Sequence, residues 1–221
     1  MSTEHKRATA SSPSSPSSSA NNEETSFDEN KVEEVLQAMR ADLSNAEAQR
    51  RGCEALFQLC GGIGFVLNDY QIAISKLGGV ELVLSAMKTH SSTAEVQQWG
   101  CAVLRGLARN EENKVAIAQQ GGIALVISVI KDWIAQPAVI RQACAALCNL
   151  AINRQNNLAI NQQGGVELVT SVMKRYSNDA GVQEESCAAI CSLSTNADSR
   201  NSVRQHGGID LILSAMRNHS N

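Results

Sequence analysis

The chain has 221 residues, enough for one or two globular domains, of which 43% are hydrophobic and only 3% aromatic. Its formal net charge of −3 lacks the basic excess of a nucleic-acid-binding domain, so we expect no nucleic-acid partner. No apolar run approaches the roughly 18 residues of a membrane helix, and the N-terminal sequence MSTEHKRATA lacks the apolar core of a secretion signal. We therefore expect no membrane insertion and a cytoplasmic protein, with the nucleus as the alternative.

Residues 1–26 are rich in serine and nearly lack aliphatic side chains. Such a segment buries too little apolar surface to offset the entropy of ordering it, so its composition predicts a disordered tail ahead of a folded region over residues 27–221. Two Ser-Pro dipeptides in the tail begin at Ser12 and Ser15. We hypothesise that phosphorylation of these serines switches a contact.

A helical pattern begins at residue 28, where Val32, Val35, Leu36 and Met39 have the spacing of one helix stripe. A second apolar stripe follows after a Ser-Asn turn, within the segment AEAQRRGCEALFQLC. These two predicted helices form a partial repeat, because the same pair of patterns returns further along the chain.

A pair of glycines then recurs every 43 residues. A fixed period of this length is the signature of stacked helical repeats. In each unit a short helix leads to the glycine pair, a middle helix begins at the pair, and a long helix follows. The pairs are Gly78-Gly79, Gly121-Gly122, Gly164-Gly165 and Gly207-Gly208. We divide the folded region into a partial repeat over 28–60, full repeats over about 66–109, 110–152 and 153–195, and a partial repeat over 196–218.

The first two long helices depart from this period, because Cys53 and Cys101 are 48 residues apart. The surplus lies in the connector CGGIGFVLNDY, between Leu59 and Gln71. Its glycines lack the preceding strand and the lysine of a phosphate-binding loop, so we predict a flexible insertion.

The long and middle helices carry two recognisable motifs. Residues 145–151 read AALCNLA, and residues 163–169 read QGGVELV. With three helices per repeat, these motifs resemble the armadillo repeat, and the resemblance covers about residues 28–218; HEAT repeats lack the short helix before the glycine pair. The resemblance implies an all-α fold, a right-handed α-solenoid superhelix of armadillo repeats, whose long helices line a concave groove for extended or helical peptides. It implies no catalysis.

The chain departs from the importin-α type of groove, which pairs Trp with Asn four residues later in each long helix. The equivalent pairs here are Glu54/Gln58, Ala102/Gly106, Ala145/Asn149 and Ala188/Ser192. Only Asn149 matches, which argues against a nuclear-transport-type adaptor. The small residues predict a shallow groove floor with room for a bulky ligand such as a partner helix.

The cysteines, methionines and histidines repeat with the period, which favours structural positions over a reactive or metal site. Cys53, Cys101, Cys144 and Cys187 share one position, and Cys148 and Cys191 share another. The methionines at 39, 87, 173 and 216 share a position in the middle helix, predicted as a core seat. The rings of His90, Trp133, Tyr176 and His219 occupy one position, where we expect a flat side chain to cover a helix end. Cys60 opens the irregular connector and is the cysteine we expect to be most reactive.

The spacing of the chemical groups suits no catalyst. The sequence contains no CxxC, no Cys/His cluster of zinc spacing and no Ser-His-Asp or Cys-His arrangement. We therefore expect no enzymatic activity, no cofactor and no metal.

The predicted binding face is the groove side of the long helices. Trp99 aligns with polar residues in the other repeats, so we expect it to be exposed and to be the hot spot of the face. Charge runs from arginines at one end to glutamates at the other, which would orient a ligand of opposite polarity. The candidate residues are Arg50, Arg51, Glu54, Gln58, Gln98, Trp99, Arg141, Gln142, Asn149, Glu184 and Glu185.

These patterns predict a non-catalytic scaffold or adaptor that holds a protein segment in the groove. The alternative is the armadillo portion of a larger regulatory protein, such as a kinase or ubiquitin-ligase subunit. The last predicted helix is a middle helix, so we also expect self-association through an open C-terminal end.

Overall fold

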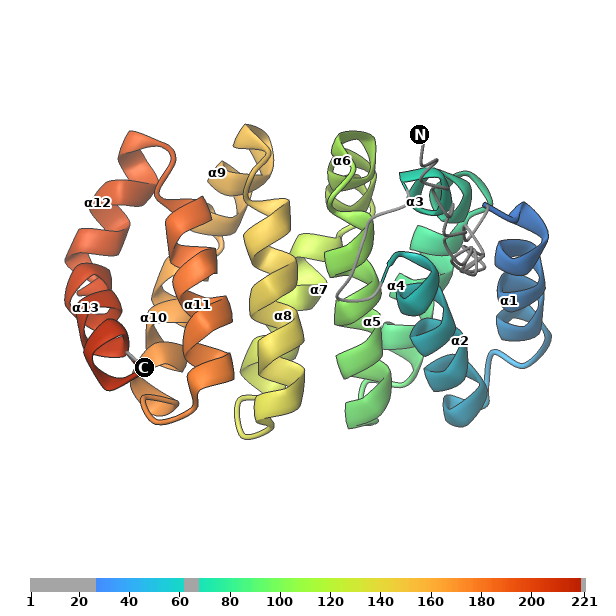
Figure 1. Cartoon of the computed structure of the whole chain (residues 1–221), viewed down its shortest axis with the longest axis horizontal. Helices are drawn as coiled ribbons and strands as arrows, with labels where there is room; N and C mark the ends of the chain where they lie inside the picture. Colours follow the sequence, from blue (N-terminus) through green and yellow to red (C-terminus); the bar gives the residue numbers. More distant parts are fainter. Residues whose placement is uncertain (1–26, 62–67, 220–221) are drawn as a thin grey trace, which may run out of the picture.

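The computed structural model describes residues 27–61 and 68–219, and every regular element in this part of the chain is a helix. Figure 1 shows the helices stacked in consecutive layers along one long axis, from α1 at one end to α12 and α13 at the other. The predicted all-α solenoid with three helices per 43-residue repeat is confirmed. The serine-rich tail, its Ser-Pro sites and most of the glycine-rich insertion lie outside the described residues.

Short, middle and long helices alternate along the chain. The short helices are α3 (Asn68–Lys76), α6 (Glu111–Gln119), α9 (Arg154–Gln162) and α12 (Ala197–Gln205). The middle helices are α1 (Glu29–Ala41), α4 (Gly79–Thr89), α7 (Gly122–Asp132), α10 (Gly165–Arg175) and α13 (Gly208–Asn218). The long helices are α2 (Ala46–Leu59), α5 (Ala94–Leu107), α8 (Pro137–Leu150) and α11 (Ala180–Leu193).

Among the described helices none is by itself long and apolar enough to cross a membrane. Only α6 and α7 together reach that length and composition, and they are bent by 73° where they meet.

The glycine pair makes the corner between short and middle helices. Gly121 has φ 80°, in the left-handed region that suits glycine. A Cβ added to its neighbour Gly122 would collide with Ile117 Cγ2 of the short helix. One glycine therefore supplies the turn and the other the close approach, which explains why the pair recurs at every corner.

Capping by side chains differs from helix to helix. Asn153 caps α9, accepting hydrogen bonds from the backbone N–H groups of Gln155 and Asn156. Pro137 occupies the first turn of α8, where a proline costs no intrahelical hydrogen bond. Thr93 lies at the N-cap position of α5, but its side chain makes no capping hydrogen bond there.

The contact between a middle helix and the long helix after it is built in the same way in several repeats. Met87 of α4 is fully buried, and a Cβ added to Gly100 of α5 would collide with its Cγ. Gln97, 1% exposed, donates from Nε2 to the carbonyl oxygens of Met87 (2.8 Å) and His90 (3.0 Å) at the end of α4. Gln49 and Gln183 do the same in their repeats. A buried amide thus satisfies carbonyls that the end of a helix leaves without intrahelical donors.

The predicted ring position joins successive repeats. The Tyr176 hydroxyl donates to the Ile134 carbonyl (2.8 Å), and Trp133 Nε1 donates to the Ser91 carbonyl (3.3 Å). His90 and His219 make the equivalent contacts with the carbonyls of Leu43 and Ser177. Each accepting carbonyl lies in the turn that follows the middle helix of the preceding repeat, so the ring covers this turn and not the helix end itself.

The equivalence of positions fails in the last repeats. Met39, Met87 and Met173 are at most 1% exposed, whereas Met216 is 61% exposed. The core seat predicted for Met216 is therefore wrong, because no long helix follows α13 within the described residues to cover it.

Candidate protein-binding surface on the long helices

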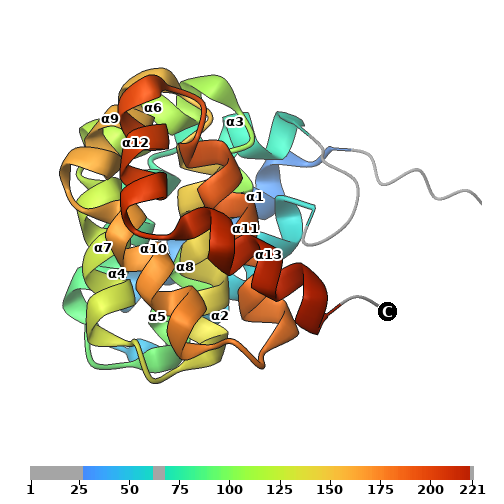
Figure 2. The same cartoon turned by 90° about the vertical axis from the view of Figure 1, so that its left-hand side faces the viewer.

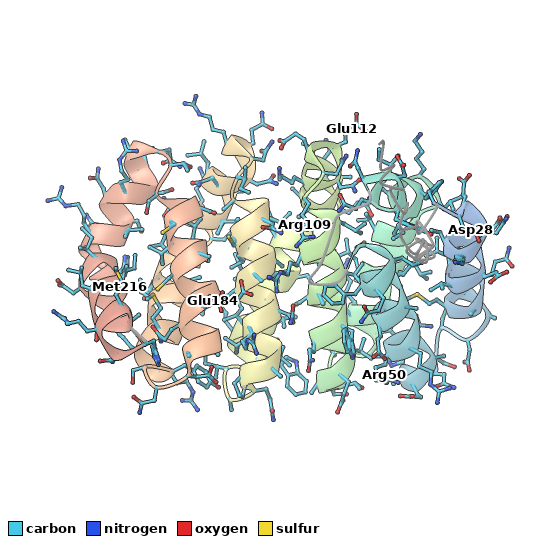
Figure 3. All side chains as sticks on the ribbon, in the orientation of Figure 1. Asp28, Arg50, Arg109, Glu112, Glu184 and Met216 are labelled. Atoms are coloured by element: carbon cyan, nitrogen blue, oxygen red, sulfur yellow. The ribbon has the colours of Figure 1, made fainter. Side chains whose placement is uncertain are left out.

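The long helices lie side by side in the order α2, α5, α8, α11 and face the viewer in Figure 1. We call the surface they share the long-helix face. All the candidate residues predicted from the sequence come from these helices. Figure 3 labels Arg50 on α2 and Glu184 on α11. The helices α5 and α8 lie between these two residues.

The arginine end of this face is electrically balanced. Arg50 forms ion pairs with Glu47 (2.7 Å) and Glu54 (2.6 Å), and Arg51 pairs with Glu47 (2.7 Å). Hydrogen bonds from the two guanidinium groups lower the pKa of Glu47 to about 2, and those carboxylates raise the pKa of Arg50. The positive end expected from the sequence is thus offset by two carboxylates of the same helix.

Trp99 is half-buried and packs against the core, so the prediction that it stands exposed is wrong. Its ring centroid lies 5.8 Å from that of Phe57 on α2, with an interplanar angle of 50°. Phe57 is 6% exposed, so the pair presents one flank of the indole at the surface. The aromatic neighbour comes from a different position of the preceding long helix, which alignment of Trp99 with its polar equivalents does not reveal.

A polar bridge crosses the centre of the face. Arg105 of α5 pairs with Glu185 of α11 at 3.0 Å, and its Nη1 donates to Gln142 Oε1 of α8 at 3.5 Å. The side chains of Arg105 and Glu185 are 24% and 14% exposed. Asn149 Nδ2 donates to the Arg105 carbonyl at 2.8 Å, so this asparagine amide holds α8 to α5.

Sequence reasoning missed Arg105. The equivalent positions in the other long helices hold Phe57, Cys148 and Cys191, which are uncharged. A single arginine at this position was therefore the feature of the sequence that could have pointed to a special role. Its partner Glu185 lies two repeats later, a distance at which the period predicts no contact.

The remaining candidate residues differ in exposure. Gln58, Arg141 and Glu184 are exposed, and Gln98 is half-buried. Arg141 lies over α11, where a Cβ added to Gly181 would be 2.7 Å from Arg141 Nε.

Three of the five small residues predicted as a groove floor are buried instead, whereas Ala188 and Ser192 are half-buried. Ala102 is 0% and Ala145 2% exposed, and a Cβ at Gly106 would lie 2.8 Å from Cys60 Cβ. Small side chains let neighbouring long helices approach closely, so these side chains become buried between the helices. The side chains that remain accessible on the face include polar groups, part of Trp99 and, on α11, Cys191.

The cysteines do not behave uniformly. Cys53, Cys101 and Cys144 are 0% exposed, and burial raises their thiol pKa values, which confirms the structural reading for them. Cys60 is 1% exposed, and burial raises its pKa to about 12, so the prediction that it is the reactive one is wrong.

Burial was wrongly expected at two cysteines of α11, the last long helix. Cys191 is exposed and Cys187 is half-buried. No group of three or more His, Cys, Asp or Glu among the described residues is placed to hold a metal ion.

Comparisons with known proteins identify the repeat type. No curated protein matches the chain. One crystal structure of an engineered protein matches with a TM-score of 0.74 and 22% identity, covering 86% of this chain and 73% of that one. A second engineered protein matches with a TM-score of 0.70 and 23% identity, covering 85% of this chain and 46% of that one. These likenesses support the fold alone. The family described as LRRK2 ARM repeat matches over residues 72–220. Together with the three-helix layers, this match shows that the chain belongs to the LRRK2 ARM repeat family of armadillo repeats.

Proposed function

We propose that the chain is a non-catalytic scaffold that holds a partner peptide or helix in the concave groove formed by its long helices. The armadillo repeat fold favours a protein partner, since stacked repeats offer an extended surface to which each layer adds side chains. The Trp99–Phe57 pair carries the proposal, because it is an aromatic anchor on the face shared by all four long helices.

The polar bridge supports the same surface. Arg105, Gln142 and Glu185 span three long helices and are partly accessible, so their remaining hydrogen-bonding positions face a ligand lying across the helices. Glu184 and Arg141 add exposed charges beside them. We propose a partner segment with an apolar side chain for the Trp99 flank and polar groups on either side.

A nuclear-transport-type adaptor is less well supported. Only Asn149 matches the Trp/Asn pattern of that groove, and its amide nitrogen is already bonded to the Arg105 carbonyl. The other alternative, the armadillo portion of a larger regulatory protein, is favoured by the family description, which names the repeat region of a protein. The mass of the polypeptide in its native cells, measured by immunoblotting, tests that alternative.

Two half-buried tryptophans offer a matched test of the long-helix face. After crosslinking and mass spectrometry have identified a partner, its affinity is measured for Trp99→Ala and for Trp133→Ala, which alters the end of middle helix α7. We expect Trp99→Ala to weaken binding about tenfold or more and Trp133→Ala to leave it within about twofold. Circular dichroism checks that both variants stay helical. Equal effects of the two substitutions would refute the proposed site.

A further inference from the structure

One ion pair on the long-helix face joins helices that are not neighbours. Arg105 of α5 and Glu185 of α11 meet at 3.0 Å, although α8 lies between these helices and packs against both. In Figure 2 the stack is seen from the end formed by α12 and α13, with the earlier layers behind them. Every other ion pair within residues 27–61 and 68–219 joins two side chains of one helix. The polar bridge therefore reaches further across the stack than these pairs.

The two positions of this pair also face each other earlier in the row. The residue equivalent to Arg105 in α2 is Phe57, and the residue equivalent to Glu185 in α5 is Trp99. The two rings pack with their centroids 5.8 Å apart. Since α2 and α5 are adjacent, the aromatic pair spans one helix spacing, whereas the longer charged side chains span two.

This span makes the ion pair sensitive to the curvature of the row. Packed helices lie roughly 8–10 Å apart between axes, so the axes of α5 and α11 would be roughly 16–20 Å apart in a flat row. Bending the row toward the long-helix face brings the Arg105 and Glu185 side chains together over α8. A given change in the spacing of adjacent helices alters the separation of α5 and α11 about twice as much, so this pair responds first.

The bridge passes beside a thiol of α8. Cys148 is half-buried, and its Sγ lies 3.3 Å from Ser192 Oγ of α11. Burial raises the pKa of this thiol and the hydrogen bond with Ser192 lowers it, while the Glu185 carboxylate raises it and the Arg105 guanidinium lowers it. Both charges of the bridge are therefore close to Cys148, and the side chains that carry them restrict access to the sulfur.

We propose that the Arg105–Glu185 pair is a conformational lock, which holds α5 and α11 bent toward each other across α8 and keeps Cys148 covered. The two side chains are 24% and 14% exposed, so salt screens this pair less than the pair of Arg51 and Glu47, whose side chains are 73% and 51% exposed. Breaking the pair lets the layers of α5 and α11 spread, which widens the long-helix face at its centre and uncovers the thiol. This role is independent of the partner segment proposed above.

Alkylation of Cys148 tests whether the lock covers the thiol. The full chain reacts with iodoacetamide at about pH 8, and the rate at each cysteine is followed by mass spectrometry with peptide fragmentation. Arg105→Met removes a cation that lowers the pKa of the Cys148 thiol, and this loss by itself slows alkylation. We expect the rate at Cys148 to rise at least about fivefold instead, because opening the lock uncovers the sulfur.

A charge swap separates the ion pair from the size of its side chains. The double variant Arg105→Glu/Glu185→Arg restores opposite charges across α8, and we expect its Cys148 rate to lie within about twofold of the wild type. Glu184→Gln, a change at the exposed neighbour of Glu185, leaves the rate unchanged. Cys144, fully buried on the same helix, stays slow in all variants. Equal acceleration of Cys144 would show that α8 unfolds, which overturns the proposal.

A distance measurement tests the spreading of the layers. Spin-labelled non-natural residues replace Ser92 and Asn178, which are exposed in the turns before α5 and α11, and pulsed electron paramagnetic resonance measures the distance between them. We expect Arg105→Met to lengthen the mean distance by about 2 Å and the charge swap to restore it. Circular dichroism checks that all variants stay helical. An unchanged distance in Arg105→Met, a Cys148 rate that does not rise, or a swap variant that reacts as fast as Arg105→Met overturns the proposal.

Discussion

Replacement of Gln97 by leucine tests the device that joins middle and long helices. The amide of Gln97 is 1% exposed and makes two hydrogen bonds, at 2.8 and 3.0 Å, to carbonyls at the end of α4. Leucine keeps most of the volume and removes both donors. The third repeat has Ile140 at the equivalent position, so an aliphatic residue fits sterically.

The expected cost follows chiefly from the Met87 carbonyl. A buried carbonyl left without its donor costs about 1–3 kcal/mol, and the added apolar burial of leucine offsets part of this. Only the Met87 carbonyl loses its donor, because the His90 carbonyl also accepts a hydrogen bond from the Thr93 backbone N–H (3.0 Å), and we expect a net loss of about 2 kcal/mol. For a chain of this size that corresponds to a fall in the melting temperature of about 4–8 °C.

Thermal unfolding followed by circular dichroism at 222 nm measures the effect. Gln98→Leu is the control, because this neighbouring side chain is half-exposed, and we expect a change within about 0.5 kcal/mol. Ile140→Gln should shift stability by less than about 1 kcal/mol, since gained hydrogen bonds offset lost apolar burial. If the Gln97→Leu variant has the same melting temperature as the wild type, the amide does not stabilise the junction of α4 and α5, and the reasoning is refuted.

Three further predictions concern packing, ionisation and thiol exposure. Gly100→Ala should destabilise the chain by about 1–3 kcal/mol in urea unfolding, and adding Met87→Ile should restore most of the loss by shortening the side chain that collides with the new Cβ. The Glu47 carboxylate should titrate by NMR near pH 2 and return toward 4.5 when its two arginine partners are replaced by alanine; because its folded pKa is lowered, the stabilisation is complete above about pH 4.5 and is lost as the pH falls toward 2. Iodoacetamide should modify Cys191 before any buried cysteine in the native chain, and equal rates across the cysteines would show that the core opens faster than assumed.

The period made the architecture readable without coordinates. The glycine pairs every 43 residues marked corners at which the first glycine takes φ near 80° and the second approaches the preceding short helix. The stripes of apolar residues placed the three helices of each unit, because a helix that packs on its neighbours must bury one side in register with them. The shared position of His90, Trp133, Tyr176 and His219 predicted an amphipathic ring with a common role, and the structure shows that this role is a bond to a turn of the preceding repeat.

The candidate site was less predictable, because it depends on what differs between repeats. Trp99 aligned with polar residues, yet Phe57 from a different position of α2 draws it against the core. Arg105 finds Glu185 two repeats away across α8, and the two arginines of α2 find carboxylates on their own helix. Such pairings depend on the direction and length of individual side chains in the stacked layers.

The sequence by itself determined that this protein is a stack of three-helix armadillo layers, since a repeated pattern requires repeated local environments. Only the tertiary structure decided which side chains remain accessible. Met216 and Cys191 share sequence positions with better buried residues, but burial is a property of the neighbours a side chain meets, and no long helix follows theirs in the described part of the chain. The physical reason is that a period describes what each layer contains, whereas exposure depends on what lies against it.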